Sequence, residues 1–283
     1  MTGRLTSYSN DGLAFDVLDE GPLDGPVVVL LHGFPQRATS WRKVVPLLHA
    51  RGYRTLAPDQ RGYSPGARPA GRSDYRIKLL VGDAAALIEA IGEGPVDVVG
   101  HDWGAAVAWS LAAAHADRVR TLTTVSVPHP GAMVRSFRTF EQLRRSWYML
   151  FFQIPRVPEL VLGRRWSAER ALRGAGMSRD AVALFSREMV EYGALPGGLG
   201  WYRAMPLSDP ALLRAKVRVP TTHVWSDGDH ALGRLGADLS ASYVVGAPYR
   251  LEVLEGVSHW VPDEAPERLA EIVLDRVAGP RTR

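Results

Sequence analysis

The stretch Val96-Asp97-Val98-Val99-Gly100-His101-Asp102-Trp103-Gly104 joins an apolar, β-branched run to a tight turn flanked by glycines. β-branched residues favour a buried strand. The residues that follow, from Ala105 to His115, carry apolar side chains at helical spacing. Glycines at 100 and 104 permit the strained strand-to-helix turn known as a nucleophile elbow, which exposes its central side chain. The stretch therefore predicts a strand, a turn presenting Asp102, and a helix.

The exposed group at this turn is a carboxylate, where a serine would be expected. A carboxylate with an ordinary pKa of about 3.9 is ionised at neutral pH. It can attack carbon without a base to remove a proton first. Asp102 therefore predicts displacement at a saturated carbon through an alkyl-ester intermediate.

Strand and helix signals alternate on both sides of the Asp102 turn. Strand-like runs lie at 27–31, 54–57, 96–99, 121–126, 220–225 and 249–254, and helical spacing at 40–50, 77–91, 105–115 and 265–277. This alternation predicts an α/β fold with a mostly parallel central sheet flanked by helices. Strand signals vanish between Pro128 and Arg218, so we expect a core of residues 1–129 and 217–283 interrupted by a helical insertion, residues 130–216.

The composition narrows the classes of partner. The 283 residues contain no cysteine, which excludes disulfides and thiol catalysis, and the net charge is +4. No run approaches the roughly 18 apolar residues of a membrane span, and residues 1–21 lack a secretory apolar segment. Arginines gather at 135–145 and 164–173 but alternate with apolar residues, as on the solvated faces of amphipathic helices. We expect a cytoplasmic protein with neither a membrane nor a nucleic-acid partner.

Four short motifs follow predicted strands, where open α/β sheets hold their ligands. They are His32-Gly33-Phe34-Pro35, the Asp102 turn, Trp225-Ser226-Asp227-Gly228-Asp229 and Gly256-Val257-Ser258-His259-Trp260. Their order of nucleophile, acid and histidine resembles that of the α/β-hydrolase fold. Within that fold, His-Gly-Phe-Pro together with Gly-His-Asp-Trp-Gly resembles the epoxide hydrolases, although haloalkane dehalogenases share the Asp-Trp turn. The resemblance implies a hydrolase whose insertion forms a cap.

The resemblance also implies roles for five residues. Asp102 would attack an epoxide carbon, and His259 would activate the water that hydrolyses the resulting ester. Asp229 would orient His259, with Asp227 as the alternative. Backbone N–H groups of Phe34 and Trp103 would hold the oxyanion.

Tyrosines of the insertion are candidates to protonate the epoxide oxygen. Gly200-Trp201-Tyr202-Arg203 resembles the cap motif that carries one such tyrosine, so Tyr202 is the first candidate. The segment 147–153 resembles the one that carries the second tyrosine, but Phe151 stands at the matching position. Tyr148, one helical turn earlier, could replace it. The alternative for this segment is an aromatic stripe that packs the cap on the core.

The sequence also nominates pocket residues and excludes a rival nucleophile. His32, Trp41, Phe137, Phe151, Trp201 and Trp260 are candidates to line the substrate pocket. Gly62-Tyr63-Ser64-Pro65-Gly66 matches a serine elbow, but Pro65 has no N–H to donate to an oxyanion. Ser64 is therefore interpreted as a turn residue.

Two alternatives remain open on the sequence. A haloalkane or haloacid dehalogenase could use the same nucleophile, and a ligand-binding protein could retain the fold without activity. The histidines form no compact ligand motif and no glycine-rich dinucleotide motif follows a strand, so no metal or cofactor is expected. The expected partners are a small apolar epoxide and water. The sequence does not decide between monomer and homodimer.

Overall fold

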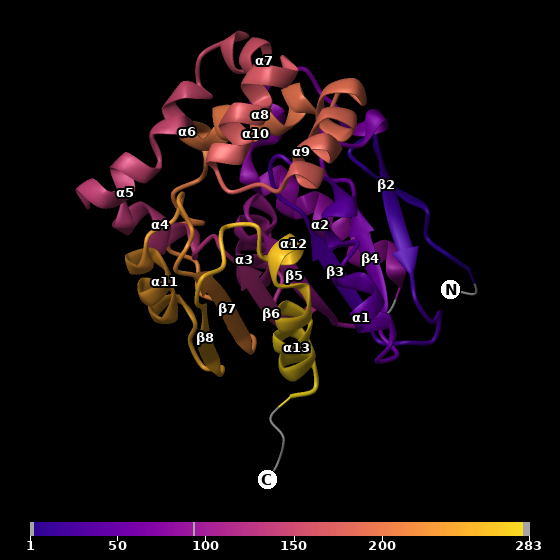
Figure 1. Cartoon of the computed structure of the whole chain (residues 1–283). Helices are drawn as coiled ribbons and strands as arrows, with labels where there is room; N and C mark the ends of the chain where they lie inside the picture. The colour runs from indigo at the N-terminus through magenta and orange to yellow at the C-terminus, as the bar shows by residue number, and fades with distance from the viewer. Residues whose placement is uncertain (1–2, 93, 280–283) are drawn as a thin grey trace.

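The computed structural model describes residues 3–92 and 94–279, and its centre is an eight-stranded sheet covered by helices on both faces (Figure 1). The strand order is β1-β2-β4-β3-β5-β6-β7-β8. The strands are β1 (Ser7–Asn10), β2 (Leu13–Glu20), β3 (Val27–Leu31), β4 (Arg54–Pro58), β5 (Val96–His101), β6 (Val119–Val125), β7 (Thr221–Ser226) and β8 (Tyr249–Leu254). Neighbouring strands from β4 to β8 pair in parallel, and this confirms the predicted mostly parallel α/β sheet.

The antiparallel strands β1 and β2 at one edge of the sheet were not predicted from the sequence. Asp11 and Gly12 form the turn between them, with φ of 48° and 76°. In β2, Phe15 and Val17 are buried while Asp16 and Leu18 face solvent. This period-two alternation is the signal that could have found the strand.

Alternate side chains of the central strands enter two separate hydrophobic clusters. Val29 and Leu31 of β3 join the cluster that packs on α2 (Ile77–Ile91) and α3 (Trp103–Ala114). Val28 and Leu30 join the cluster beneath α1 (Val45–His49) and α13 (Pro266–Val277). All four are fully buried, and each such side chain contributes roughly 1.5–3 kcal/mol to folding. This two-sided burial explains why the strand reads as a continuous apolar run.

Most predicted elements agree with the structure to within one or two residues, but the helix predicted over residues 40–50 is divided. A 3₁₀ turn spans Ala38–Trp41, and α1 begins only at Val45, with Pro46 in its first turn. Proline lacks an N–H and is tolerated at the start of a helix rather than inside it. The helical spacing in this segment therefore belongs to two short elements.

Helices fill the chain between β6 and β7. They are α4 (Pro130–Ser136), α5 (Phe140–Arg145), α6 (Trp147–Phe151), α7 (Val157–Leu162), α8 (Arg165–Gly174), α9 (Arg179–Phe185) and α10 (Leu195–Ala204). Figure 1 shows α6 to α10 stacked above the sheet, with α5 projecting to one side. Two further helices, α11 (Arg234–Ser240) and α12 (Val261–Glu264), follow β7 and β8. No helix among the described residues is long and apolar enough to cross a lipid bilayer.

Candidate active site

Asp102 occupies the turn between β5 and α3 with φ 52° and ψ −123°. Such backbone angles in a residue other than glycine cost roughly 1–3 kcal/mol. Gly104 allows the turn to close, because a Cβ added there would lie 2.0 Å from the Leu31 carbonyl oxygen. The helix thus begins directly against β3, and the Asp102 side chain projects from the C-terminal end of the sheet.

Each oxygen of the Asp102 carboxylate has a different neighbour. Oδ1 accepts a hydrogen bond from the backbone N–H of Phe34 at 2.7 Å. Oδ2 lies 3.4 Å from Nε2 of His259. Gly33 leaves room for this arrangement, since a Cβ there would lie 2.3 Å from Oδ1. One carboxylate oxygen is therefore held by the backbone and the other faces an imidazole.

His259 is held on its far side by Asp229. Its Nδ1 lies 2.7 Å from Oδ2 of Asp229, whose other oxygen accepts the N–H groups of Ala231 and Leu232 at 2.7 and 3.0 Å. Asp227 lies elsewhere, and its carboxylate accepts the Gly256 N–H at 2.8 Å. Of the two aspartates considered from the sequence, the structure brings Asp229 to the histidine.

The two carboxylates determine the charge of His259. Burial lowers the pKa of its imidazole, but Asp229 and Asp102 outweigh this effect and raise that pKa to about 10. Burial raises the pKa of Asp229, while the charge of His259 and its hydrogen bonds lower it, with a net decrease. At neutral pH the histidine is an imidazolium between two carboxylates.

Two tyrosines of the insertion lie beside Asp102. Tyr202 on α10 and Tyr148 on α6 have ring centroids 6.0 Å apart, and Tyr202 packs edge-on against Trp103 at 5.1 Å. Burial, followed by the Asp102 carboxylate, raises the pKa of both phenols. Both are therefore protonated at neutral pH and can donate hydrogen bonds.

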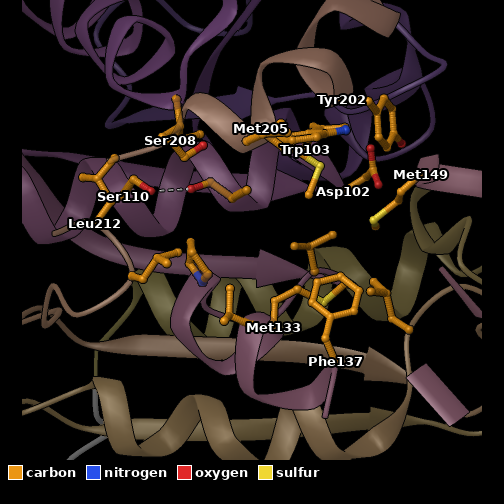
Figure 2. Close-up of a pocket in the computed structure, with 18 of the residues that line it drawn as sticks. Asp102, Trp103, Ser110, Met133, Phe137, Met149, Tyr202, Met205, Ser208 and Leu212 are labelled. Carbon is orange, nitrogen blue, oxygen red and sulfur yellow. Dashed lines mark hydrogen bonds between the residues drawn. The ribbon is translucent and has the colours of Figure 1, made fainter. Parts of the chain in front are cut away.

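Two apolar cavities meet at this group. One has a volume of about 350 Å³ and the other about 430 Å³, and Asp102, Tyr148 and Tyr202 line both. Figure 2 shows the smaller cavity, with Asp102 and Tyr202 at one end and Ser110 and Ser208 at the other. A ligand with two apolar arms could place its centre at the carboxylate and one arm in each cavity.

Some residues nominated as pocket lining do reach a cavity. Phe151 and Trp260 line the larger cavity, and Phe137 lines the smaller one. Methionines 133 and 149 also line the smaller cavity. These two methionines were not predicted as lining, because helical spacing alone does not reveal which side of a helix faces a cavity.

Three of the predicted lining residues, His32, Trp41 and Trp201, line neither cavity in the described part of the chain. For these three residues the prediction was wrong. Trp41 is fully buried in the cluster beneath α1 and α13. The His32 ring accepts the Gln60 N–H through Nε2 at 3.1 Å. The indole of Trp201 donates to the Arg61 carbonyl at 2.7 Å. Each is committed to core structure.

The Ser64 hydroxyl is held by two backbone groups. Its hydroxyl donates to the Asp59 carbonyl at 2.7 Å and accepts the Asp16 N–H at 2.8 Å. These bonds join β2 to the loop after β4, as expected for a turn residue. In the described part of the chain, no group of three His, Asp or Glu side chains is placed to hold a metal ion.

The chain is similar to known hydrolases in both sequence and structure. Residues 26–266 match the alpha/beta hydrolase fold family. The chain is 33% identical to AB hydrolase superfamily protein YfhM of Bacillus subtilis over 97% of this chain and 98% of that protein. It is 31% identical to epoxide hydrolase A of Mycobacterium tuberculosis over 98% of both chains. The crystal structure of epoxide hydrolase A from Mycobacterium thermoresistibile superposes with a TM-score of 0.82 and 28% identity, covering 96% of this chain and 97% of that one.

Proposed function

Because this chain belongs to the alpha/beta hydrolase fold family and is a hydrolase, we propose that it opens epoxides to vicinal diols through an ester on Asp102. The observation that carries the proposal is the Asp102 carboxylate, which lies between the His259–Asp229 pair and two protonated tyrosines. The curated relatives named as epoxide hydrolases support the same reaction. In this proposal residues 130–216 form the cap over a core of residues 1–129 and 217–283.

In the first step Oδ2 of Asp102 attacks one epoxide carbon, and the bond from that carbon to the ring oxygen breaks. Oδ1 is the poorer nucleophile because it accepts the Phe34 N–H. The ring oxygen takes a proton from Tyr202, with Tyr148 as the second donor. A phenol at this position stabilises charge that develops only as the ring opens, which is the form of stabilisation that accelerates a reaction.

Esterification itself then prepares the second step. The Asp102 carboxylate helps to hold the pKa of His259 at about 10. An ester carries no charge, so the pKa of His259 falls once the ester forms, and the imidazolium passes its proton to the tyrosinate. The neutral Nε2 then accepts a proton from water, while Asp229 holds Nδ1.

Water adds to Cγ of Asp102, and the negative charge develops on Oδ1. The Phe34 N–H already contacts this oxygen at 2.7 Å, and the Trp103 N–H is the proposed second donor of the oxyanion hole. Collapse breaks the ester bond, and the leaving alkoxide takes a proton from His259. The regenerated Asp102 acid gives its proton to His259, which restores the carboxylate and the imidazolium, so one epoxide and one water yield one diol.

The dehalogenase alternative has less support. A leaving halide requires side-chain donors, and Phe34 offers none at the position after His-Gly. The two phenols instead provide a proton, which an oxygen leaving group needs and a halide does not. The aromatic neighbours of Asp102 therefore favour an epoxide as the electrophile.

A single turnover in ¹⁸O-labelled water tests the ester mechanism. trans-Stilbene oxide serves as the epoxide probe and 1-bromobutane as the halide probe. We expect diol product and one ¹⁸O atom in the peptide that contains Asp102. Productive turnover without label at Asp102 would reject the covalent route, and bromide release without diol formation would favour the dehalogenase.

A further inference from the structure

Helices α5 to α8 expose large apolar side chains along one continuous stretch of chain. Phe140 is 82% exposed, Trp147 65%, Leu150 76% and Trp166 74%. Leu143 and Leu160 are also more than half exposed. Soluble proteins rarely expose so many large apolar groups within one segment, and their number here indicates an interaction site. We call the exposed apolar side chains of residues 140–166 the apolar face.

The side chains around the apolar face carry an excess of positive charge. Residues 130–216 contain 14 basic and 7 acidic side chains, a net charge of +7, whereas the whole chain has +4. The exposed arginines near the apolar face are Arg135, Arg138, Arg144, Arg156, Arg164, Arg165, Arg170 and Arg173. Exposed carboxylates in this part of the chain, residues 134–173, are restricted to Glu141 and Glu169. A partner that complements the apolar face therefore has a negatively charged surface and an apolar interior.

The larger cavity reaches the surface beside this face. Trp147 belongs to the apolar face and also lines the cavity. The exposed residues Ala171, Gly174 and Ala175 on and after α8 line the same cavity. An apolar molecule that leaves a partner bound to the apolar face would therefore enter the larger cavity without passing through bulk water.

We propose that the apolar face docks on an anionic lipid bilayer. The aromatic and aliphatic side chains enter the interfacial region, as on amphipathic helices that lie in the plane of a membrane. The exposed arginines contact the headgroup phosphates and supply the preference for anionic lipid. This is peripheral binding, and the proposal differs from the expectations of no membrane partner and of arginines on solvated helix faces. A second copy of the chain fits less well, because two such faces would oppose arginine with arginine.

Vesicle binding tests the proposal with the whole chain and no substrate. The wild type is sedimented with vesicles of phosphatidylcholine and phosphatidylglycerol, and separately with phosphatidylcholine alone. We expect binding to the anionic vesicles that weakens as salt is raised. The double variant Phe140→Ser with Leu150→Ser should bind at least about tenfold more weakly, since two large apolar side chains no longer insert. Neither residue lines a cavity.

The matched control is Leu18→Ser with Leu23→Ser, two residues of similar chemistry that are 43% and 41% exposed outside the insertion. It should bind like the wild type.

Arg138→Gln with Arg144→Gln should lose most of the preference for anionic lipid. Absence of wild-type binding, or equal binding by the Phe140 and control variants, would overturn the proposal. Concentration-dependent dimerisation that only the Phe140 variant loses, without vesicle binding, would assign the face to a second copy. Because no turnover is needed, failure here leaves the proposed reaction untouched.

Discussion

At the scale of single residues, His259 owes its charge to its two carboxylate neighbours. The Asp102→Asn variant mimics the uncharged ester, so it isolates the contribution of Asp102. We expect the pKa of His259 to be about 10 in the wild type and clearly lower in Asp102→Asn. The imidazolium should therefore persist to higher pH in the wild type. NMR titration of the histidine ring protons measures both values, and equal values would contradict the proposed coupling.

His259→Gln separates the two chemical steps. Glutamine cannot accept a proton from water, so ester hydrolysis should slow by about 10²–10⁴-fold while ester formation continues. Intact-protein mass spectrometry should then show the Asp102 adduct accumulating. An active variant without adduct would refute the role of His259 as base.

The two tyrosines can be compared directly by removing each hydroxyl. Tyr202→Phe should slow ester formation by about 10²-fold, and Tyr148→Phe should slow it less if Tyr202 is the main donor. Tyr63→Phe is a matched control, because the buried Tyr63 hydroxyl has no hydrogen-bond partner among the described residues and lines neither cavity. Stopped-flow tryptophan fluorescence under single-turnover conditions measures the step. Equal rates for Tyr202→Phe and Tyr63→Phe would remove Tyr202 from the mechanism.

The residues whose placement could be predicted best from the sequence are those that follow the end of a strand. Asp102, His259 and Asp229 each follow a strand of one parallel sheet, so their strands bring them together. Lining residues carry no such constraint. Trp41 and Trp201 are aromatic, as pocket residues often are, but local geometry turns them into the core.

At the scale of elements, the turn at Asp102 depends on close contact between α3 and β3. Gly104→Ala would place a methyl group 2.0 Å from the Leu31 carbonyl oxygen. We expect a loss of at least about 1–3 kcal/mol in the free energy of unfolding, because this backbone has no room to yield. Urea denaturation measures the loss. Gly174→Ala, where nothing lies within 4 Å of the added carbon, should be neutral or slightly stabilising. Equal effects of the two substitutions would contradict this account.

Elements were predictable where burial and periodicity agree. The all-buried strand β3 and the helix α2 appear where the apolar runs placed them. The antiparallel strands β1 and β2 were not predicted, because half of their side chains are exposed and they form no continuous apolar run. The helix expected over residues 40–50 was divided because Pro46 favours a helix start over helix interior.

At the scale of the whole molecule, buried neutral histidines make the fold sensitive to acid. Burial holds the pKa of His32, His101 and His223 at about 4 and that of His129 at about 3. In the unfolded chain each titrates near 6.5. The unfolded state therefore binds more protons as pH falls below about 6.5, and stability declines until the folded state is protonated near pH 4.

We expect the urea concentration at the unfolding midpoint to decrease when the pH is lowered from 7 to 5. Each buried histidine should account for a loss of up to about 3 kcal/mol in the free energy of unfolding near pH 4. His223→Gln should reduce this pH dependence, since His223 is fully buried and its ring hydrogen-bonds only to Thr124 among the described residues. The exposed His230 gives the control His230→Gln, which should keep the wild-type slope. A midpoint that does not change with pH would contradict the account.

The helices of the insertion could be predicted from the sequence, but the way they pack over the sheet could not. Helices α6 and α10 are about fifty residues apart, yet Tyr148 and Tyr202 meet beside Asp102. Periodicity identifies a helix but not its partner, and the exposed apolar face of α5 to α8 was equally hidden. Both features depend on which distant segments pack together, and a single sequence does not show this.

The unequal cavities on the two sides of Asp102 also impose handedness on the proposed reaction. An epoxide with two unlike substituents can span volumes of about 350 and 430 Å³ in two orientations. Each orientation presents a different ring carbon to the carboxylate, and attack inverts the configuration of that carbon alone. The fit of the substituents therefore selects which ring carbon is inverted, and chiral chromatography of the diol formed from a single epoxide enantiomer reads out that choice.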